Sequence, residues 1–108
     1  MERYKKLRDV LKQIQMEENN EVKIGNKDFL VYIRSVELLM RKQQMKIITL
    51  KARGKNIVKC VDVAEAAKNK FLNDINVTVG DIKTYTDKYE FEGRERFVSC
   101  IDIELVVK

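Results

Sequence analysis

The chain has 108 residues, of which 44% are apolar and 36% are charged, and its formal net charge is +5. This length and composition are typical of one globular domain with a modest core, and they exclude a disordered chain. No apolar run approaches the roughly 20 residues of a membrane-spanning helix, and the N-terminus lacks the apolar stretch of a signal peptide, so we expect an intracellular protein with no membrane partner.

The first element predicted is an amphipathic helix over residues 2–18, because apolar side chains recur there at spacings of three and four. This stripe can pack on its own domain, pair with a partner or lie on a membrane surface, and the acids among its cations favour the first two. We divide the chain into an N-terminal helical extension, 1–20, and a main domain, 21–108. The stripe consists of Tyr4, Leu7, Leu11 and Ile14.

The main domain is predicted to begin with a strand, a helix and a second strand. Residues 21–25 alternate as a short strand, and residues 29–43 carry the apolar stripe of a helix. Asp28 stands where this helix begins and is a candidate N-cap. Residues 45–53 alternate as the next strand.

Gly54 ends this strand, and a second helix is predicted over about 56–72. Two strands, 75–86 and 96–107, complete the chain, with a polar hairpin tip over 87–96 between them. This order predicts an α+β two-layer sandwich, in which two helices cover one face of a four-stranded mixed sheet. The second helix is expected to turn inward the side chains of Ile57, Val61, Ala64, Ala67 and Phe71.

The sequence offers few groups that an enzyme could use. It has no His and no phosphate-loop or nucleophile-turn motif. Asp102 and Glu104 could be imagined as a catalytic pair, but the polar face of a strand explains them better. Cys60 and Cys100 form no CxxC pattern and are expected to be small buried residues. We therefore expect no catalytic residue, no metal and no cofactor.

The cations are concentrated in one stretch, 38–61, which contains no acid. A solvated surface normally mixes both signs, so this stretch indicates an anionic partner. The turn at Gly54 precedes a helix whose first N–H groups are unpaired, and a phosphate there would also meet Lys51, Arg53 and Lys55. A lone glycine with no acid nearby in the sequence favours a polynucleotide backbone over a single nucleotide.

Aromatic residues form only one cluster, near the expected hairpin. It consists of Tyr85, Tyr89 and Phe91. Proteins that read single strands by stacking line a sheet face with aromatic residues. This sparse cluster therefore argues against such a reader.

Three segments carry a resemblance to a known family. The chain reads KARGKNIVKCVDVAEAAKNKF over 51–71, IGNKDFLVYI over 24–33 and IDIELVVK over 101–108. The first resembles the signature of the Alba family of chromatin and RNA-binding proteins, in which a strand ends in K-A-R-G and a helix with a V-D pair follows. The other two resemble the family's earlier strand-to-helix turn and its last strand. The similarity spans residues 21–108, and the family fold has the order of elements predicted above.

The resemblance implies a non-catalytic protein that binds double-stranded DNA or RNA as a dimer, either a homodimer or a heterodimer with a related Alba-like chain. It implies a role in chromatin or in translation regulation, and a place in the nucleus or cytoplasm if the source is eukaryotic. In the family the two strand-to-helix turns form a basic body and the β-hairpins reach out as arms. Carried onto this chain, the body residues are Lys27, Lys51, Arg53 and Lys55, and the arm residues are Lys88, Arg94 and Arg96. The acid-free stretch adds Arg41, Lys42 and Lys59 as candidate nucleic-acid contacts.

Three alternatives stay open. The family often has two lysines and a proline after the glycine of the first turn, whereas Gly25 is followed here by Asn26, Lys27 and Asp28, so acetylation of this turn is an open question. The hairpin over 87–96 carries more acids than cations, so it is either an arm or a solvated loop. The alternative function is a heterodimerising assembly subunit of a ribonucleoprotein such as ribonuclease P, with weak nucleic-acid affinity alone.

Overall fold

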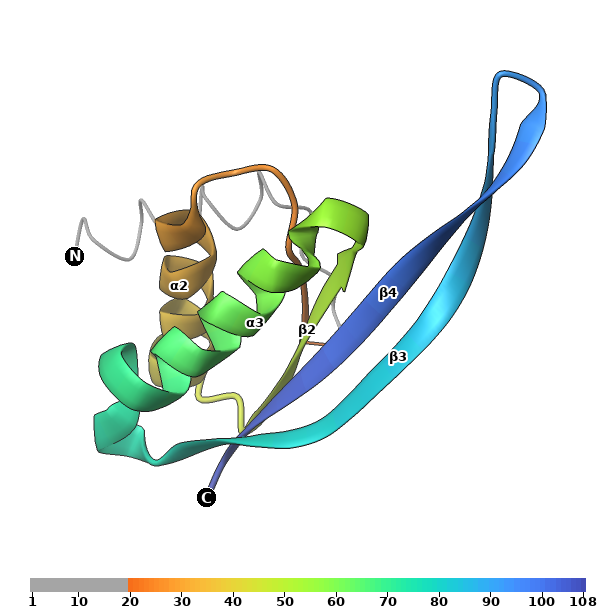
Figure 1. The fold of residues 1–108 in the computed structure, drawn as a ribbon. Coiled ribbons are helices and arrows are strands. Elements are labelled where there is room, and N and C mark those ends of the chain that lie inside the picture. The colour runs from red at the N-terminus through yellow and green to blue at the C-terminus, as the bar shows by residue number, and fades with distance from the viewer. Residues whose placement is uncertain (1–19) are drawn as a thin grey trace.

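The computed structural model describes residues 20–108, so the helix predicted over 2–18 lies outside the described residues. The described part has the predicted order of elements, and it forms two layers, a sheet and a pair of helices (Figure 1). The elements are strands β1 (Glu21–Lys23), β2 (Ile47–Arg53), β3 (Val77–Phe91) and β4 (Arg94–Val107), and helices α2 (Phe29–Glu37) and α3 (Ile57–Ala66).

The four strands form one mixed sheet with the order β1-β2-β4-β3. β1 and β2 are parallel because α2 carries the chain back between them, as crossover connections do. After α3 the chain enters the far edge as β3 and returns as β4, which pairs antiparallel with both β3 and β2. The two parallel strands therefore end at the same edge of the sheet, and each is followed there by a helix.

Both helices cover one face of the sheet, as predicted. α2 contributes Ile33 and Val36 to the core and the turn that follows it contributes Leu39, and all three are at most 1% exposed. α3 packs on β2 and β4, where Leu50 and Leu105 are fully buried. A π-helical turn continues each helix, over Leu38–Lys42 and Ala67–Phe71.

The predicted inward face of α3 was wrong at one position. Val61 is 40% exposed, whereas Cys60 and Val63 are fully buried. The buried stripe consists of Cys60, Val63, Ala64 and Ala67, which follow the spacing of three and four residues on one helix face. Both cysteines are buried and free, as predicted.

The hairpin tip was also predicted wrongly. Residues 87–96 belong almost entirely to strands, and β3 and β4 pair as far as Phe91 and Arg94. Only Glu92 and Gly93 form the turn, with φ angles of 52° and 73°, as two-residue hairpin turns require. The hairpin is therefore a long two-stranded ribbon that projects beyond the helices (Figure 1).

Candidate nucleic-acid interface

The two strand-to-helix turns lie side by side, because β1 and β2 are parallel neighbours. Ile24 donates a backbone hydrogen bond to the carbonyl of Lys51 at 2.7 Å, which joins the ends of the two strands. Asn56 then donates its side-chain amide to the Asn26 side chain at 3.3 Å. The sequence separates these two turns by some 30 residues, and the sheet brings them to one edge.

The first turn is held from below by two side chains. The buried hydroxyl of Tyr32 accepts hydrogen bonds from the N–H groups of Gly25 at 2.9 Å and Lys27 at 3.2 Å. The ammonium of Lys59 donates to the carbonyls of the same two residues, at 2.7 and 2.8 Å. Lys59 was predicted as a nucleic-acid contact, and the structure places its charge inside the turn as a support.

Asp28 occupies the N-cap position of α2, as predicted, but its side chain makes no capping hydrogen bond. The carboxylate is exposed beside Lys27, which is also exposed. The negative charge therefore lies on the surface of the first turn, where it partly offsets the lysine.

The second turn depends on its glycine. Gly54 has a φ of +56°, which side-chain-bearing residues rarely adopt, and a Cβ there would come within 3.2 Å of the Val98 methyl group. Arg53 and Lys55, on either side of Gly54, are exposed. We call Lys27, Arg53 and Lys55 the turn surface; none of the three forms an ion pair with another residue in the described range.

Lys51 differs from its predicted neighbours in the site. Its ammonium lies 3.4 Å from the Glu21 carboxylate and 3.7 Å from that of Asp102. Burial opposes the charged form, but Asp102 and Glu21 outweigh it and raise the pKa of Lys51. The sequence showed no acid near Lys51, because both acids reach it through strand pairing. A phosphate would have to compete with two carboxylates for this cation.

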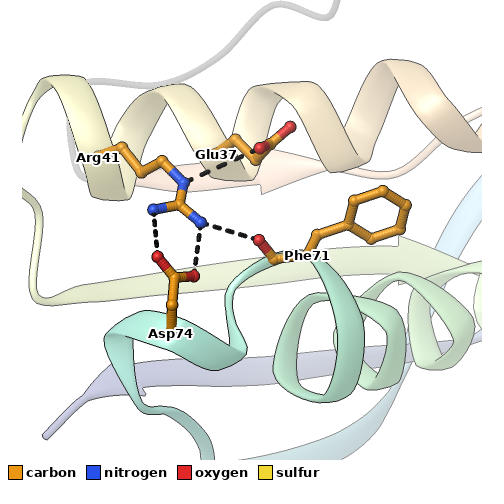
Figure 2. A network of polar contacts seen from close by, with 4 residues as sticks. All are labelled: Glu37, Arg41, Phe71 and Asp74. Carbon is orange, nitrogen blue, oxygen red and sulfur yellow. Dashed lines mark hydrogen bonds and ion pairs between the residues drawn. The ribbon is translucent and has the colours of Figure 1, made fainter.

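Arg41 and Lys42 lie at the opposite end of the helices from the turn surface. Figure 2 shows the Arg41 guanidinium bonded to both carboxylate oxygens of Asp74, at 2.7 and 2.9 Å. Arg41 also donates to the Phe71 carbonyl at 2.9 Å and lies 3.9 Å from Glu37. It thus ties the end of α2 to the end of α3, and the hydrogen bond from Arg41 lowers the pKa of Asp74.

The three predicted arm residues lie on opposite faces of the hairpin. Lys88 lies 3.4 Å from the Glu95 carboxylate and packs over the ring of Phe97. Arg94 and Arg96 pair with Phe91 and Tyr89 across the strands, on the other face. Both arginines are exposed and form no ion pair within residues 20–108.

Sequence reasoning missed the alignment of the hairpin aromatics with these arginines. Tyr85, Tyr89 and Phe91 alternate with polar residues on β3, so all three face one side. Arg53 of the turn surface lies 5.8 Å from the centre of the Tyr89 ring. The period-two spacing was the signal, but both faces of a projecting ribbon are exposed, and no buried face made the alternation easy to recognise.

The described residues offer little for metal or thiol chemistry. No group of three His, Cys, Asp or Glu side chains within them could hold a metal ion. Burial raises the pKa of the Cys60 thiol to about 12, so it stays protonated and unreactive. Asp102, one of the two strand carboxylates, accepts a hydrogen bond from the Tyr85 hydroxyl at 2.9 Å and pairs with Lys51. No helix between residues 20 and 108 is long and apolar enough to cross a membrane.

Known proteins are similar to this chain in sequence and in fold. A profile of the Alba family matches residues 20–86. The DNA/RNA-binding protein Alba of Nanoarchaeum equitans is 40% identical over 90 residues, which cover 82% of this chain and 98% of that protein. The DNA/RNA-binding protein Alba 1 of Archaeoglobus fulgidus is 37% identical over 89 residues, covering 82% and 97%.

Two solved structures are also similar. Alba from Thermoplasma volcanium superposes with a TM-score of 0.73 at 33% identity, covering 81% of this chain and 99% of that one. ALBA1 from Trypanosoma brucei shares the fold, with a TM-score of 0.60 at 24% identity over 85% of this chain and 72% of that one. With the same elements, the same turn signature and relatives aligned over nearly their whole length, this chain belongs to the Alba family.

Proposed function

We propose that this protein binds double-stranded DNA and RNA through their phosphate backbones and catalyses no reaction on them. The observation that carries the proposal is the turn surface, where Lys27, Arg53 and Lys55 are exposed and form no ion pair with another of the described residues. Separate cations along one edge suit a polynucleotide, because each can neutralise a different phosphate. The names of the Alba relatives, DNA/RNA-binding proteins, support the same reading.

Arg94 and Arg96 extend this contact along the hairpin. Both arginines lie on the same ribbon face as Tyr89, which Arg53 contacts, so the ribbon continues the turn surface. Arginine suits phosphate because its planar group donates two hydrogen bonds at once. Lys51, Lys59 and Arg41 are assigned structural roles instead, since each is engaged by acids or carbonyls of the protein.

The proposal includes a homodimer. α3 covers β2 and β4, whereas β3 is covered only at its start, around Val77 and Val79, so apolar side chains of α3 and of both hairpin strands remain exposed. We call them the apolar patch, and an exposed group of this kind marks an interaction surface. Its members and their exposed fractions are Val58 (70%), Val61 (40%), Ile82 (56%) and Phe97 (63%).

The turn surface is tested by replacing Lys27, Arg53 and Lys55 together with Ala. Binding to duplex DNA should weaken with little regard to sequence, and the slope of log affinity against log salt should fall by about 3, given ~0.9 per phosphate contact. A matched variant removes three exposed lysines at the opposite end of the fold and should leave the slope unchanged. An equal loss in both variants would show that net charge alone attracts the nucleic acid. The matched positions are Lys46, Lys70 and Lys108.

The dimer is tested by light scattering at tens of micromolar. The protein should have the mass of two chains, and Val58→Asp should give single chains that remain folded by circular dichroism. If the protein is monomeric alone and dimeric only with a related Alba-like chain, the homodimer is wrong and the assembly-subunit alternative is favoured.

A further inference from the structure

The two faces of the hairpin ribbon have different chemistry. Residues that pair across the strands point to the same face, so the pairing assigns every side chain to one side. The helix-facing side pairs Glu90 with Glu95 and Lys88 with Phe97, and it carries more acid than base. The opposite side, which we call the open face, carries Tyr85, Tyr89, Phe91, Arg94 and Arg96.

The formal charge of the whole hairpin therefore does not describe the charge of either face. On the open face Arg94 lies opposite Phe91 and Arg96 lies opposite Tyr89, and Asp87 is the one acid in the same stretch of strand pairs, 87–98. The open face is thus cationic and aromatic, whereas the acids collect on the other side. Opposite faces of one ribbon can contact different partners at the same time.

The aromatic rings of the open face are exposed. Tyr85 is 42% exposed, Tyr89 44% and Phe91 54%. Tyr89 lies opposite Arg96 and Phe91 opposite Arg94, and about half of each of these two aromatic side chains remains exposed to water. The Tyr85 hydroxyl is held by Asp102, whereas the Tyr89 ring is contacted by the Arg53 guanidinium.

Tyr89 and Phe91 are spaced suitably for bases. Residues two apart on a strand are separated by about 7 Å, which is twice the ~3.4 Å rise between stacked bases. One unpaired base therefore fits between the two side chains. Arg53 lies on the ring of Tyr89, which links this stacking position to the phosphate contacts of the turn surface.

We propose that the open face of the hairpin binds the unpaired bases of a single strand, of RNA or DNA, by stacking them on Tyr89 and Phe91. Arg94 and Arg96 hold the phosphates on either side. A duplex cannot use this position in the same way, because its bases already stack on one another. The inference rests on the proposed function, since it adds single strands to the duplex ligands of the same surface, and it revises the expectation that the aromatic cluster is too sparse for stacking.

The test compares a single strand of about 12 nucleotides with a duplex of the same sequence, as RNA and as DNA, at one salt concentration. Tyr89→Leu combined with Phe91→Leu removes the rings but keeps apolar side chains on the strand. Affinity for the single strand should fall by at least about 10-fold, since stacking on an aromatic residue contributes about that much per base. In the same Leu variant, affinity for the duplex should change by less than about twofold, and the slope of log duplex affinity against log salt should stay the same. The matched control exchanges the two residues, Tyr89→Phe with Phe91→Tyr. It should bind the single strand as tightly as the wild type does, because both aromatic rings remain.

A second variant reports the contact between residue 91 and a base directly, by fluorescence. The chain has no Trp, so Phe91→Trp introduces a single indole whose fluorescence should be quenched by the single strand and much less by the duplex. Absence of quenching on saturating single strand would overturn the inference, as would an equal loss of both ligands in the Leu variant. A wild-type protein that binds neither ligand would instead overturn the proposed function itself.

Discussion

The two ends of the helical layer use their cations in opposite ways. At one end, Arg41 is bonded to Asp74 and to the Phe71 carbonyl and ties the two helices together. At the other end, Arg53 and Lys55 are exposed on the turn surface. All three cations come from the same acid-free stretch of sequence, 38–61. The comparison teaches that the role of a cation depends on the acids that the fold brings beside it, and not on its neighbours in the chain.

Arg41→Ala should have the largest effect and should act on stability alone. It leaves the buried Glu37 and the Phe71 carbonyl without the guanidinium, which should lower the free energy of unfolding by about 2 kcal/mol. Urea denaturation measures this change, and Lys70→Ala at the same end serves as the control. If duplex affinity fell while stability stayed the same, the contrast between the two ends would be wrong.

Tyr32→Phe tests how the binding end is held. Two backbone N–H groups of the first turn would lose their acceptor, so we expect a loss of about 1 kcal/mol in stability. Amide exchange at Gly25 and Lys27 should become faster. Tyr85→Phe, which removes an exposed hydroxyl bond, is the control and should change stability by less. Unchanged exchange in the Tyr32 variant would show that Lys59 alone holds the turn.

Asp102→Asn tests whether the acids beside Lys51 keep this cation from contributing to binding, because it removes one of its two ion pairs. With one of its two carboxylates neutralised, Lys51 should contribute more to binding, and duplex affinity should rise by about two- to threefold at low salt. Glu104→Gln makes the same change in net charge on the same strand without touching Lys51. Equal gains in the two variants would mean that net charge, rather than Lys51, is responsible.

The smallest expected effect is the pH dependence of stability that comes from the Arg41–Asp74 ion pair. The hydrogen bond from Arg41 lowers the pKa of Asp74 from its ordinary value of 3.8. A lowered carboxyl pKa contributes stability above 3.8, and this contribution is lost as the pH falls through the folded-state value. The melting temperatures of the wild type and Asp74→Asn should therefore differ at pH 6 and converge towards pH 2. A difference that persists at pH 2 would show that the charge of Asp74 is not what Arg41 requires.

The fold was predictable from sequence because its buried stripes are regular. The alternation of β2 and the three-and-four spacing of α2 each mark one buried face, and the structure confirms both elements. The hairpin was not predictable in the same way, because neither face of the ribbon at 87–96 is buried. On α3, Val61 was chosen for its apolar character, although it lies on the uncovered side of the helix.

The candidate site was predictable in outline only. The glycine-centred turn and its flanking Arg53 and Lys55 could be read directly from local sequence. The engagement of Lys51 by Glu21 and Asp102 could not, since it depends on the register of three strands. The support of the first turn by Lys59 likewise depends on how α3 packs beside that turn.

The contact between Gly54 and Val98 has a consequence for how copies would be arranged along a nucleic acid. Gly54 belongs to the body and Val98 lies at the root of the projecting hairpin, and a Cβ at residue 54 would come within 3.2 Å of the Val98 methyl group, so arm and body pack closely at this point. In the proposed complex the orientation of the arm on the body sets the footprint, the length of strand that one copy occludes. Gly54→Ala would strain the left-handed backbone of the turn and displace Val98 by a few tenths of an ångström, so we expect the spacing of neighbouring copies to change. Binding density along a long strand would record that change, whereas affinity for a short oligonucleotide would not.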